Sequence, residues 1–174
     1  MWSLPRSRVS SRAARLWLFL AVLAVDQLTK AGVLAYLTEP AGPIRLGPLL
    51  NLVHVRNFGI GFGFLGDGGT GQQWALAGFA LIVAVVLMVM QARTDARLYA
   101  TGLTLIASGA VGNAICRLAR GSVVDFIDVH VAGYHWPAFN VADTAITLGA
   151  LCVIVHALPL QQAVARLRSP PRGR

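Results

Sequence analysis

Four long apolar runs constrain the fold of this chain more than any other feature. They cover residues 14–37, 72–90, 99–115 and 137–158, and each approaches the roughly 20 residues that a helix needs to cross a bilayer. Helices are expected because a backbone in lipid must satisfy its own hydrogen bonds. Hydrophobic residues make up 56% of the 174 and charged residues only 13%, which excludes an ordinary soluble domain. We therefore expect an all-α membrane protein, a single domain over residues 1–174 with four transmembrane helices.

The arginines predict how these helices are oriented. Ten of the fifteen basic residues lie before the first run, between the second and third, or after the last: Arg6, Arg8, Arg12, Arg15, Arg93, Arg97, Arg166, Arg168, Arg172 and Arg174. Such residues gather on the cytoplasmic side of membrane proteins. Both termini are therefore expected in the cytoplasm, with residues 38–71 and 117–136 outside it. The net charge of +8 is explained by topology, and no basic stripe interleaved with aromatic residues indicates nucleic-acid binding.

The first run also has the features of a secretory signal peptide. Its arginine-rich start precedes a short apolar stretch, and Val22, Leu23 and Ala24 would fit a cleavage site. Apolar character resumes after Lys30 and continues to Leu37, however, and this length favours a complete membrane span.

The outer segment 38–71 is rich in glycine and polar residues, and residues 46–55 within it favour a β-strand. In residues 58–64 large apolar residues alternate strictly with glycine. A strand with one apolar face fits this pattern, and so does a loop lying on the membrane. We expect a small extracytoplasmic β-rich segment between the first and second helices.

Two aspartates are the strongest functional candidates. Asp143 lies a few residues inside the last apolar run, where an acid is costly to hold and therefore usually functional. Asp125 precedes it, and Gly133 and Pro137 between them allow the backbone to turn back. Two carboxylates that lie close together in a partly desolvated site can share one proton, as in aspartic proteases. We predict that Asp125 and Asp143 form a catalytic pair.

Further polar side chains share helix faces near the same membrane surface. Asn113 and Arg117 are four residues apart at the outer end of the third run, and Asn140 lies three residues before the second aspartate. Taken singly, each fits a polar network that only joins helices; taken with the aspartates, they favour a site. Asp26 and Lys30 are also four apart, and we interpret them as a structural ion pair rather than as catalytic groups.

Histidines and cysteines are weaker candidates. His130 and His135 with Asp128 could be drawn as a zinc site, but too few ligands accompany them, and we expect no metal. Cys116 with a histidine could form a nucleophile and base, but no third group nearby would orient the pair. Cys152 lies at another depth in the membrane, so a disulfide to Cys116 is not expected.

Five blocks of residues carry a resemblance to a known family. The chain resembles the bacterial lipoprotein signal peptidases (signal peptidase II), in the order of that family, through Asp26-Gln27-Leu28-Thr29-Lys30, Asn57-Phe58-Gly59-Ile60-Gly61-Phe62, Gly112-Asn113-Ala114-Ile115-Cys116-Arg117, Val123-Val124-Asp125-Phe126-Ile127 and Phe139-Asn140-Val141-Ala142-Asp143-Thr144-Ala145-Ile146. Together these blocks extend over most of the chain. One block alone would be a weak signal, whereas five in order on a four-span protein are specific.

The resemblance implies a membrane aspartyl endopeptidase of the bacterial inner membrane. Its substrates would be prolipoproteins, cut just before a cysteine that carries a diacylglyceryl group, at the outer leaflet. The catalytic pair maps onto Asp125 and Asp143. The substrate site maps onto matching positions in the other blocks: Asn57, Gly59, Asn113, Arg117 and Asn140. No cofactor is implied, the partners are the prolipoprotein and membrane lipid, and a monomer is expected.

Two departures from the family pattern stand out. Cys116 replaces an aspartate that the family usually has just before the arginine, and Gly61 replaces an alanine. We expect the first change to deprive Arg117 of a partner. The rival interpretation of the whole chain is a small four-span transporter whose buried acid binds a cation or a proton. It is disfavoured because Asp143 lies near the interface rather than at the midplane.

Overall fold

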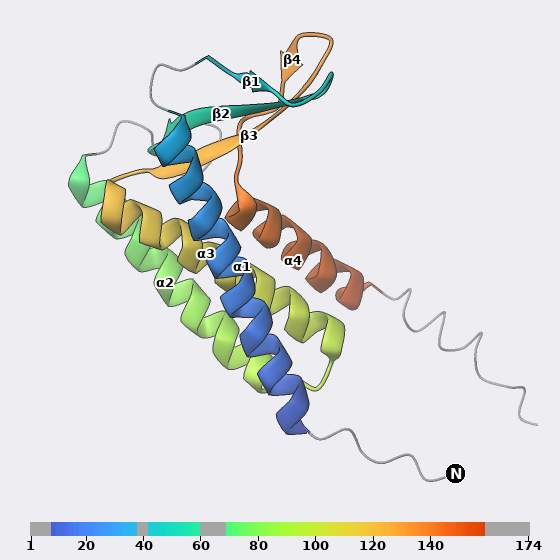
Figure 1. Cartoon of the computed structure of the whole chain (residues 1–174). Coiled ribbons are helices and arrows are strands. Elements are labelled where there is room, and N and C mark those ends of the chain that lie inside the picture. The colour runs from blue at the N-terminus through green and yellow to red at the C-terminus, as the bar shows by residue number, and fades with distance from the viewer. Residues whose placement is uncertain (1–7, 38–41, 60–68, 159–174) are drawn as a thin grey trace, which may run out of the picture.

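Four helices dominate the computed structural model, which describes residues 8–37, 42–59 and 69–158. They are α1 (Arg8–Tyr36), α2 (Thr70–Ala92), α3 (Arg97–Arg120) and α4 (Val141–Ala157). The first three are long and apolar enough to cross a membrane, whereas α4 has 17 residues and is shorter. A small sheet covers one end of the helices, and α1 begins at the opposite end (Figure 1).

The sheet has four antiparallel strands in the order β1-β2-β3-β4. They are β1 (Ile44–Arg45), β2 (Leu50–Asn57), β3 (Val123–Val131) and β4 (Tyr134–His135). The long strands β2 and β3 are paired from Leu50 opposite Val129 to Asn57 opposite Val123, with one irregularity in the register between Leu52 and Val55. Ala132 and Gly133, with φ angles of 50° and 85°, form the tight turn between β3 and β4, as two-residue hairpins require.

The sheet corrects the predicted β-rich segment. Only β1 and β2 come from the chain between α1 and α2, and the other half of the sheet comes from the predicted outer loop 117–136. The stretch 117–136 is expected from the sequence only as an outer segment, but β2 needs a hydrogen-bonding partner and β3 supplies it. The alternation over residues 58–64 lies, from residue 60 on, outside the described residues.

The helix boundaries also differ from the predicted apolar runs, and the first helix begins at Arg8 rather than at residue 14. The third helix continues beyond residue 115 to Arg120, where Gly121 ends it with a φ angle of 71°. The fourth helix begins at Val141 rather than at residue 137, because Phe139 is still extended and pairs with Ile127 of β3. This extended link brings the start of α4 beside the sheet.

Small residues allow α3 and α4 to pack closely. A Cβ atom added to Gly102 would lie 2.7 Å from the carbonyl oxygen of Gly149, and one added to Gly109 would overlap the carbonyl oxygen of Ala142. Near the sheet, a buried apolar cluster joins α1, α3 and β3: Val33, Leu37, Cys116, Val123, Val124 and Phe126. This cluster fixes the sheet on the helix ends. Cys116 and Cys152 are both free thiols.

Candidate active site

Asp125 is the third residue of β3 and is almost completely buried. Both of its carboxylate oxygens accept hydrogen bonds from neutral amides. The Asn140 Nδ2 donates to Oδ1 at 2.6 Å, and the Asn57 Nδ2 donates to Oδ2 at 2.9 Å. The first donor comes from the start of α4 and the second from the end of β2, so the carboxylate is held where three elements meet.

Asp143 is fixed by the first turn of α4. Asn140 is the N-cap of this helix: its Oδ1 accepts from the Asp143 backbone N–H at 3.0 Å, and its own N–H donates to the Asp143 Oδ2 at 3.1 Å. This reciprocal arrangement is a capping box, here with an aspartate in the third helical position. The other oxygen, Oδ1, accepts from the Asn113 Nδ2 at 2.8 Å. One residue, Asn140, therefore contacts both aspartates.

A buried ion pair lies directly behind Asn113. Lys30 donates to Asp26 at 2.9 Å and to the Asn113 Oδ1 at 2.9 Å, and both charged residues are almost fully buried. The other Asp26 oxygen accepts from the backbone N–H of Ala142 in α4 at 2.9 Å. The predicted pairing of Asp26 with Lys30 is confirmed. The pair does more than anchor one helix, because it joins α1, α3 and α4.

The segment that follows β2 is held over the site by two further side chains. The Arg117 Nη2 donates to the carbonyl oxygen of Gly59 at 2.8 Å, and the Gln73 Nε2 of α2 donates to that of Phe58 at 2.6 Å. The Gly59 N–H itself donates to the Asn57 Oδ1 at 2.9 Å. Sequence reasoning missed Gln73, whose signal is a polar residue in the first turn of a very apolar helix.

Cys116 has a different neighbour from the one that we predicted. Its thiol sulfur accepts from the Arg120 Nη1 at 3.2 Å, whereas the guanidinium of Arg117 is directed to Gly59. Replacing the usual aspartate by cysteine therefore alters the surroundings of Arg120, one helical turn further on. The expectation that Arg117 loses a partner stays a prediction: its Nη2 has the Gly59 carbonyl as acceptor, whereas its buried Nε has no hydrogen-bond partner among the described residues.

Burial raises the pKa of Asp125 to about 6, with the hydrogen bond from Asn57 acting against the shift and the nearby charge of Asp143 adding to it. A carboxyl group in this range gains or loses its proton near neutral pH. Because two carboxylates close together do not ionise independently, they titrate as a pair. The arrangement can therefore hold one proton between two acids, which is what acid–base chemistry on water needs.

Asp128, also on β3, has separate surroundings. Burial alone would raise its pKa, but hydrogen bonds from Asn51 and His135 hold that pKa below its ordinary value. His135 lies 2.8 Å from the carboxylate and stacks on His130 at 5.0 Å between ring centroids. No group of three metal-binding side chains occurs among the described residues.

The predicted site residues thus lie together. Seven of them are linked by hydrogen bonds into one continuous network, in which each member contacts at least one other: Asn57, Gly59, Asn113, Arg117, Asp125, Asn140 and Asp143. Their roles in catalysis stay predictions. The fold and this network define a multi-pass membrane protein that holds two aspartates among neutral amides where its helices meet a sheet.

Comparisons with known proteins identify the family. The profile of the family described as Signal peptidase (SPase) II matches residues 18–159. The lipoprotein signal peptidase of Yersinia enterocolitica is 43% identical over 80% of this chain and 83% of its own length, and that of Paraburkholderia phymatum is 43% identical over 82% and 87%. The chain belongs to the signal peptidase II family.

Solved structures show the same fold. Two of them are described as a "Bacterial membrane enzyme structure by the in meso method", at 2.3 and 1.9 Å resolution. The first superimposes with a TM-score of 0.71 and 27% identity over 93% of this chain and 95% of that one. The second has a TM-score of 0.68 and 29% identity over 84% and 93%.

Proposed function

We propose that this protein is a membrane aspartyl endopeptidase that removes the signal peptides of prolipoproteins. The bond cut lies just before the cysteine that carries the diacylglyceryl group. Family membership supports this activity over the transporter alternative. The observation that carries the mechanism is that Asn140 contacts both aspartates, so that the two carboxylates belong to one network.

In the proposed reaction Asp125 and Asp143 share one proton. The ionised aspartate takes a proton from water as the water attacks the scissile carbonyl, and the protonated one donates to the carbonyl oxygen. As the C–N bond breaks, the proton taken from water passes to the leaving amine, and the proton on the former carbonyl oxygen returns to the other aspartate, so that the pair again holds one proton. No metal is required for these steps. The raised pKa of Asp125, about 6, suits a group that must exist in both forms near neutral pH.

The amides and Arg117 would position the reactants. Asn113 and Asn140 direct N–H groups at the carboxylates, which keeps each carboxylate in one orientation. Arg117 binds the carbonyl oxygen of Gly59, so that the chain after β2 forms a wall beside the pair where an extended substrate could bind. All these residues come from one chain, and a monomer suffices.

Four membrane spans with both termini in the cytoplasm are part of this proposal. At about 1.5 Å per residue, α4 is about 26 Å long, slightly less than the roughly 30 Å hydrocarbon core. The sheet and the aspartate pair would then lie at the outer leaflet of the inner membrane, where a lipid-anchored substrate presents its bond. A reporter enzyme that works only in the cytoplasm should be active when fused after Arg174, and a reporter that works only outside the cytoplasm should be inactive there. Activity on the outer side instead would contradict this topology.

The test is cleavage of a lipid-modified precursor by purified protein. Asp125→Asn and Asp143→Asn should each abolish cleavage, because each acid has its own task. Asp128→Asn is the matched control, since this aspartate lies on the same strand but contacts Asn51 and His135. The control should retain most activity. Near-normal cleavage by either of the first two variants would contradict the catalytic pair.

A further inference from the structure

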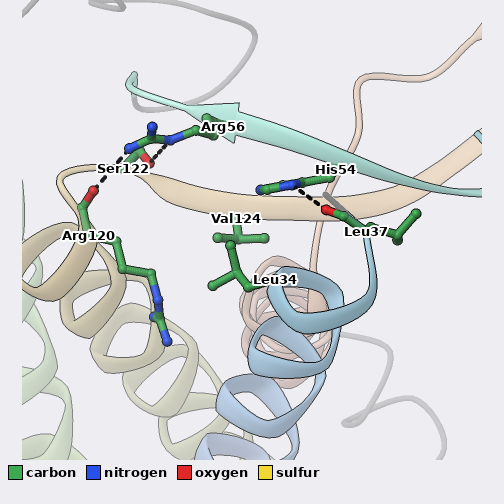
Figure 2. A pocket seen from close by; sticks show the side chains of 7 residues that line it. All are labelled: Leu34, Leu37, His54, Arg56, Arg120, Ser122 and Val124. Carbon is green, nitrogen blue, oxygen red and sulfur yellow. Dashed lines mark hydrogen bonds between the residues drawn. The ribbon is translucent and has the colours of Figure 1, made fainter. Parts of the chain in front are cut away.

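A pocket lies on the face of β2 and β3 opposite to the candidate active site. Neighbouring residues of a strand point to opposite faces, so Val124 and Arg56, which are paired across β3 and β2, point away from the face of Asp125. The pocket has a volume of about 500 Å³. Figure 2 shows the side chains around it: Leu34, Leu37, His54, Arg56, Arg120, Ser122 and Val124.

The lining divides into an apolar part and a cationic part. Leu34 in the last turn of α1, Leu37 directly after that helix, and Val124 of β3 provide the apolar side. Arg56 and Arg120 provide two guanidinium groups. In Figure 2 the Arg120 side chain runs along α3 away from the sheet, toward the level of Leu34. The pocket is therefore amphipathic and lies where membrane-length helices meet the sheet.

The two guanidiniums contact only neutral acceptors within the described part of the chain. Arg56 donates to the Ser122 Oγ at 3.1 Å and to the carbonyl oxygen of Arg120 at 3.2 Å, and its guanidinium also lies 5.3 Å from the centre of the Phe58 ring. Arg120 donates to the Cys116 thiol at 3.2 Å. A guanidinium has five N–H donors and prefers a charged oxygen acceptor. Two such groups beside one pocket favour an anionic ligand.

We propose that this pocket binds an anionic phospholipid of the surrounding leaflet. The headgroup would lie along the side of the pocket that Arg56 and Arg120 form, with its phosphate beside the Arg120 guanidinium and its remaining polar atoms toward Arg56. The start of an acyl chain would lie against Leu34 and Leu37. The diacylglyceryl group of the substrate is uncharged, so the substrate lipid gives no reason for two arginines here. A free phosphate would leave the apolar side of the pocket unfilled.

Such a lipid would also support the active site from behind. Arg56 already joins the end of α3 to β2, and β2 carries Asn57, the next residue, on its opposite face. A bound phosphate would hold this connection in place. Anionic lipid is therefore expected to stabilise the full-length protein.

The test is lipid binding to the purified full-length protein in detergent, measured by native mass spectrometry. Phosphatidylglycerol should bind at least tenfold more tightly than phosphatidylcholine, the size expected for one additional charged hydrogen bond. Arg120→Gln should remove this preference, whereas Arg120→Lys should retain part of it. Arg45→Gln is the matched control, because Arg45 is an exposed arginine of the same sheet outside the pocket. It should retain the preference in full.

Leu34→Trp tests the position of the site without changing a charge. The larger side chain should fill the apolar side and weaken phosphatidylglycerol binding at least tenfold, while cleavage of the lipid-modified precursor shows that the variant is folded. Unchanged binding by Leu34→Trp or Arg120→Gln, or an equal loss in Arg45→Gln, would overturn the proposal. Displacement of the lipid by millimolar inorganic phosphate would overturn the lipid as the ligand and leave a simple phosphate site.

Discussion

Asn140 offers the sharpest test of the site, because the oxygen and the nitrogen of its side-chain amide make separate contacts. Its Oδ1 caps α4 by accepting from the Asp143 N–H, and its Nδ2 donates to Asp125 at 2.6 Å and to the Asn113 Oδ1 at the longer distance of 3.4 Å. Serine is about as good an N-cap as asparagine, but its side chain has no amide to reach Asp125. Asn140→Ser should therefore remove the contacts of the amide nitrogen and keep the cap, whereas Asn140→Ala removes both.

The magnitudes follow from the two contacts. A hydrogen bond to a charged group contributes about 1.5–3 kcal/mol, and an N-cap about 0.5–2 kcal/mol. The bond from Asn140 also favours the ionised form of Asp125, so its loss should raise the pKa of Asp125 further above about 6. At about 1.4 kcal/mol for each pH unit, the acid limb of the cleavage profile should move upward by about one to two units.

The assay is the rate of precursor cleavage against pH, together with thermal unfolding in detergent, for the wild type and both variants. Both variants should show the shifted acid limb, and Asn140→Ala should unfold at a lower temperature than Asn140→Ser. An acid limb for Asn140→Ser that coincides with that of the wild type would refute the role of this hydrogen bond. Equal unfolding temperatures for the two variants would refute the proposed role of the Asn140 side chain as the N-cap of α4.

Three further predictions address stability and chemistry. The pKa of Asp125 is raised from its ordinary value to about 6 in the folded protein, so ionisation of Asp125 destabilises the fold progressively as the pH rises from about 4 to about 6, and by the full amount above that range. Asp125→Asn should therefore add up to about 3 kcal/mol of unfolding free energy at pH 8 and little at pH 4. Gly109→Ala should lower the unfolding temperature, with a cost of about 1–3 kcal/mol or more, because the new Cβ overlaps the carbonyl of Ala142; an unchanged temperature would contradict the close helix contact. Cys116→Ala should cleave the precursor at close to the wild-type rate, and a folded but inactive variant would indicate a cysteine nucleophile instead.

The helices and the aspartate pair could be predicted because their signals are local. Apolar runs of membrane length fix the helices, and the polar residues at spacings of three and four fix the faces that carry Asn113, Arg117, Asn140 and Asp143. When the helices pack with these faces together, their polar side chains come within hydrogen-bonding distance of one another. The capping box of α4 is itself a sequence pattern, with Asn140 three residues before an acid.

The sheet could not be predicted in the same way. Pairing between β2 and β3 joins segments about 70 residues apart in the sequence. A local sequence pattern can indicate that a segment is a strand, but it does not indicate which other strand will pair with it. β3 is also covered by helix ends at Val123 and Val124 while it carries Asp125 into a polar site, so its burial does not follow a simple apolar–polar alternation. Its position became evident only through its long-range partners.

The partner of Cys116, by contrast, could have been found from helix geometry. Arg117 follows it directly and therefore points about 100° away around α3, whereas Arg120, four residues on, shares its face. An aspartate at residue 116 would consequently pair with Arg120, and the cysteine of this chain leaves that charge with a thiol as its acceptor. Cys116→Asp should therefore weaken the preference for phosphatidylglycerol without changing which bond is cut. Cys116→Ala, which introduces no charge, should leave the preference intact. Equal lipid preference in both variants would show that Arg120 does not contribute its charge to the pocket.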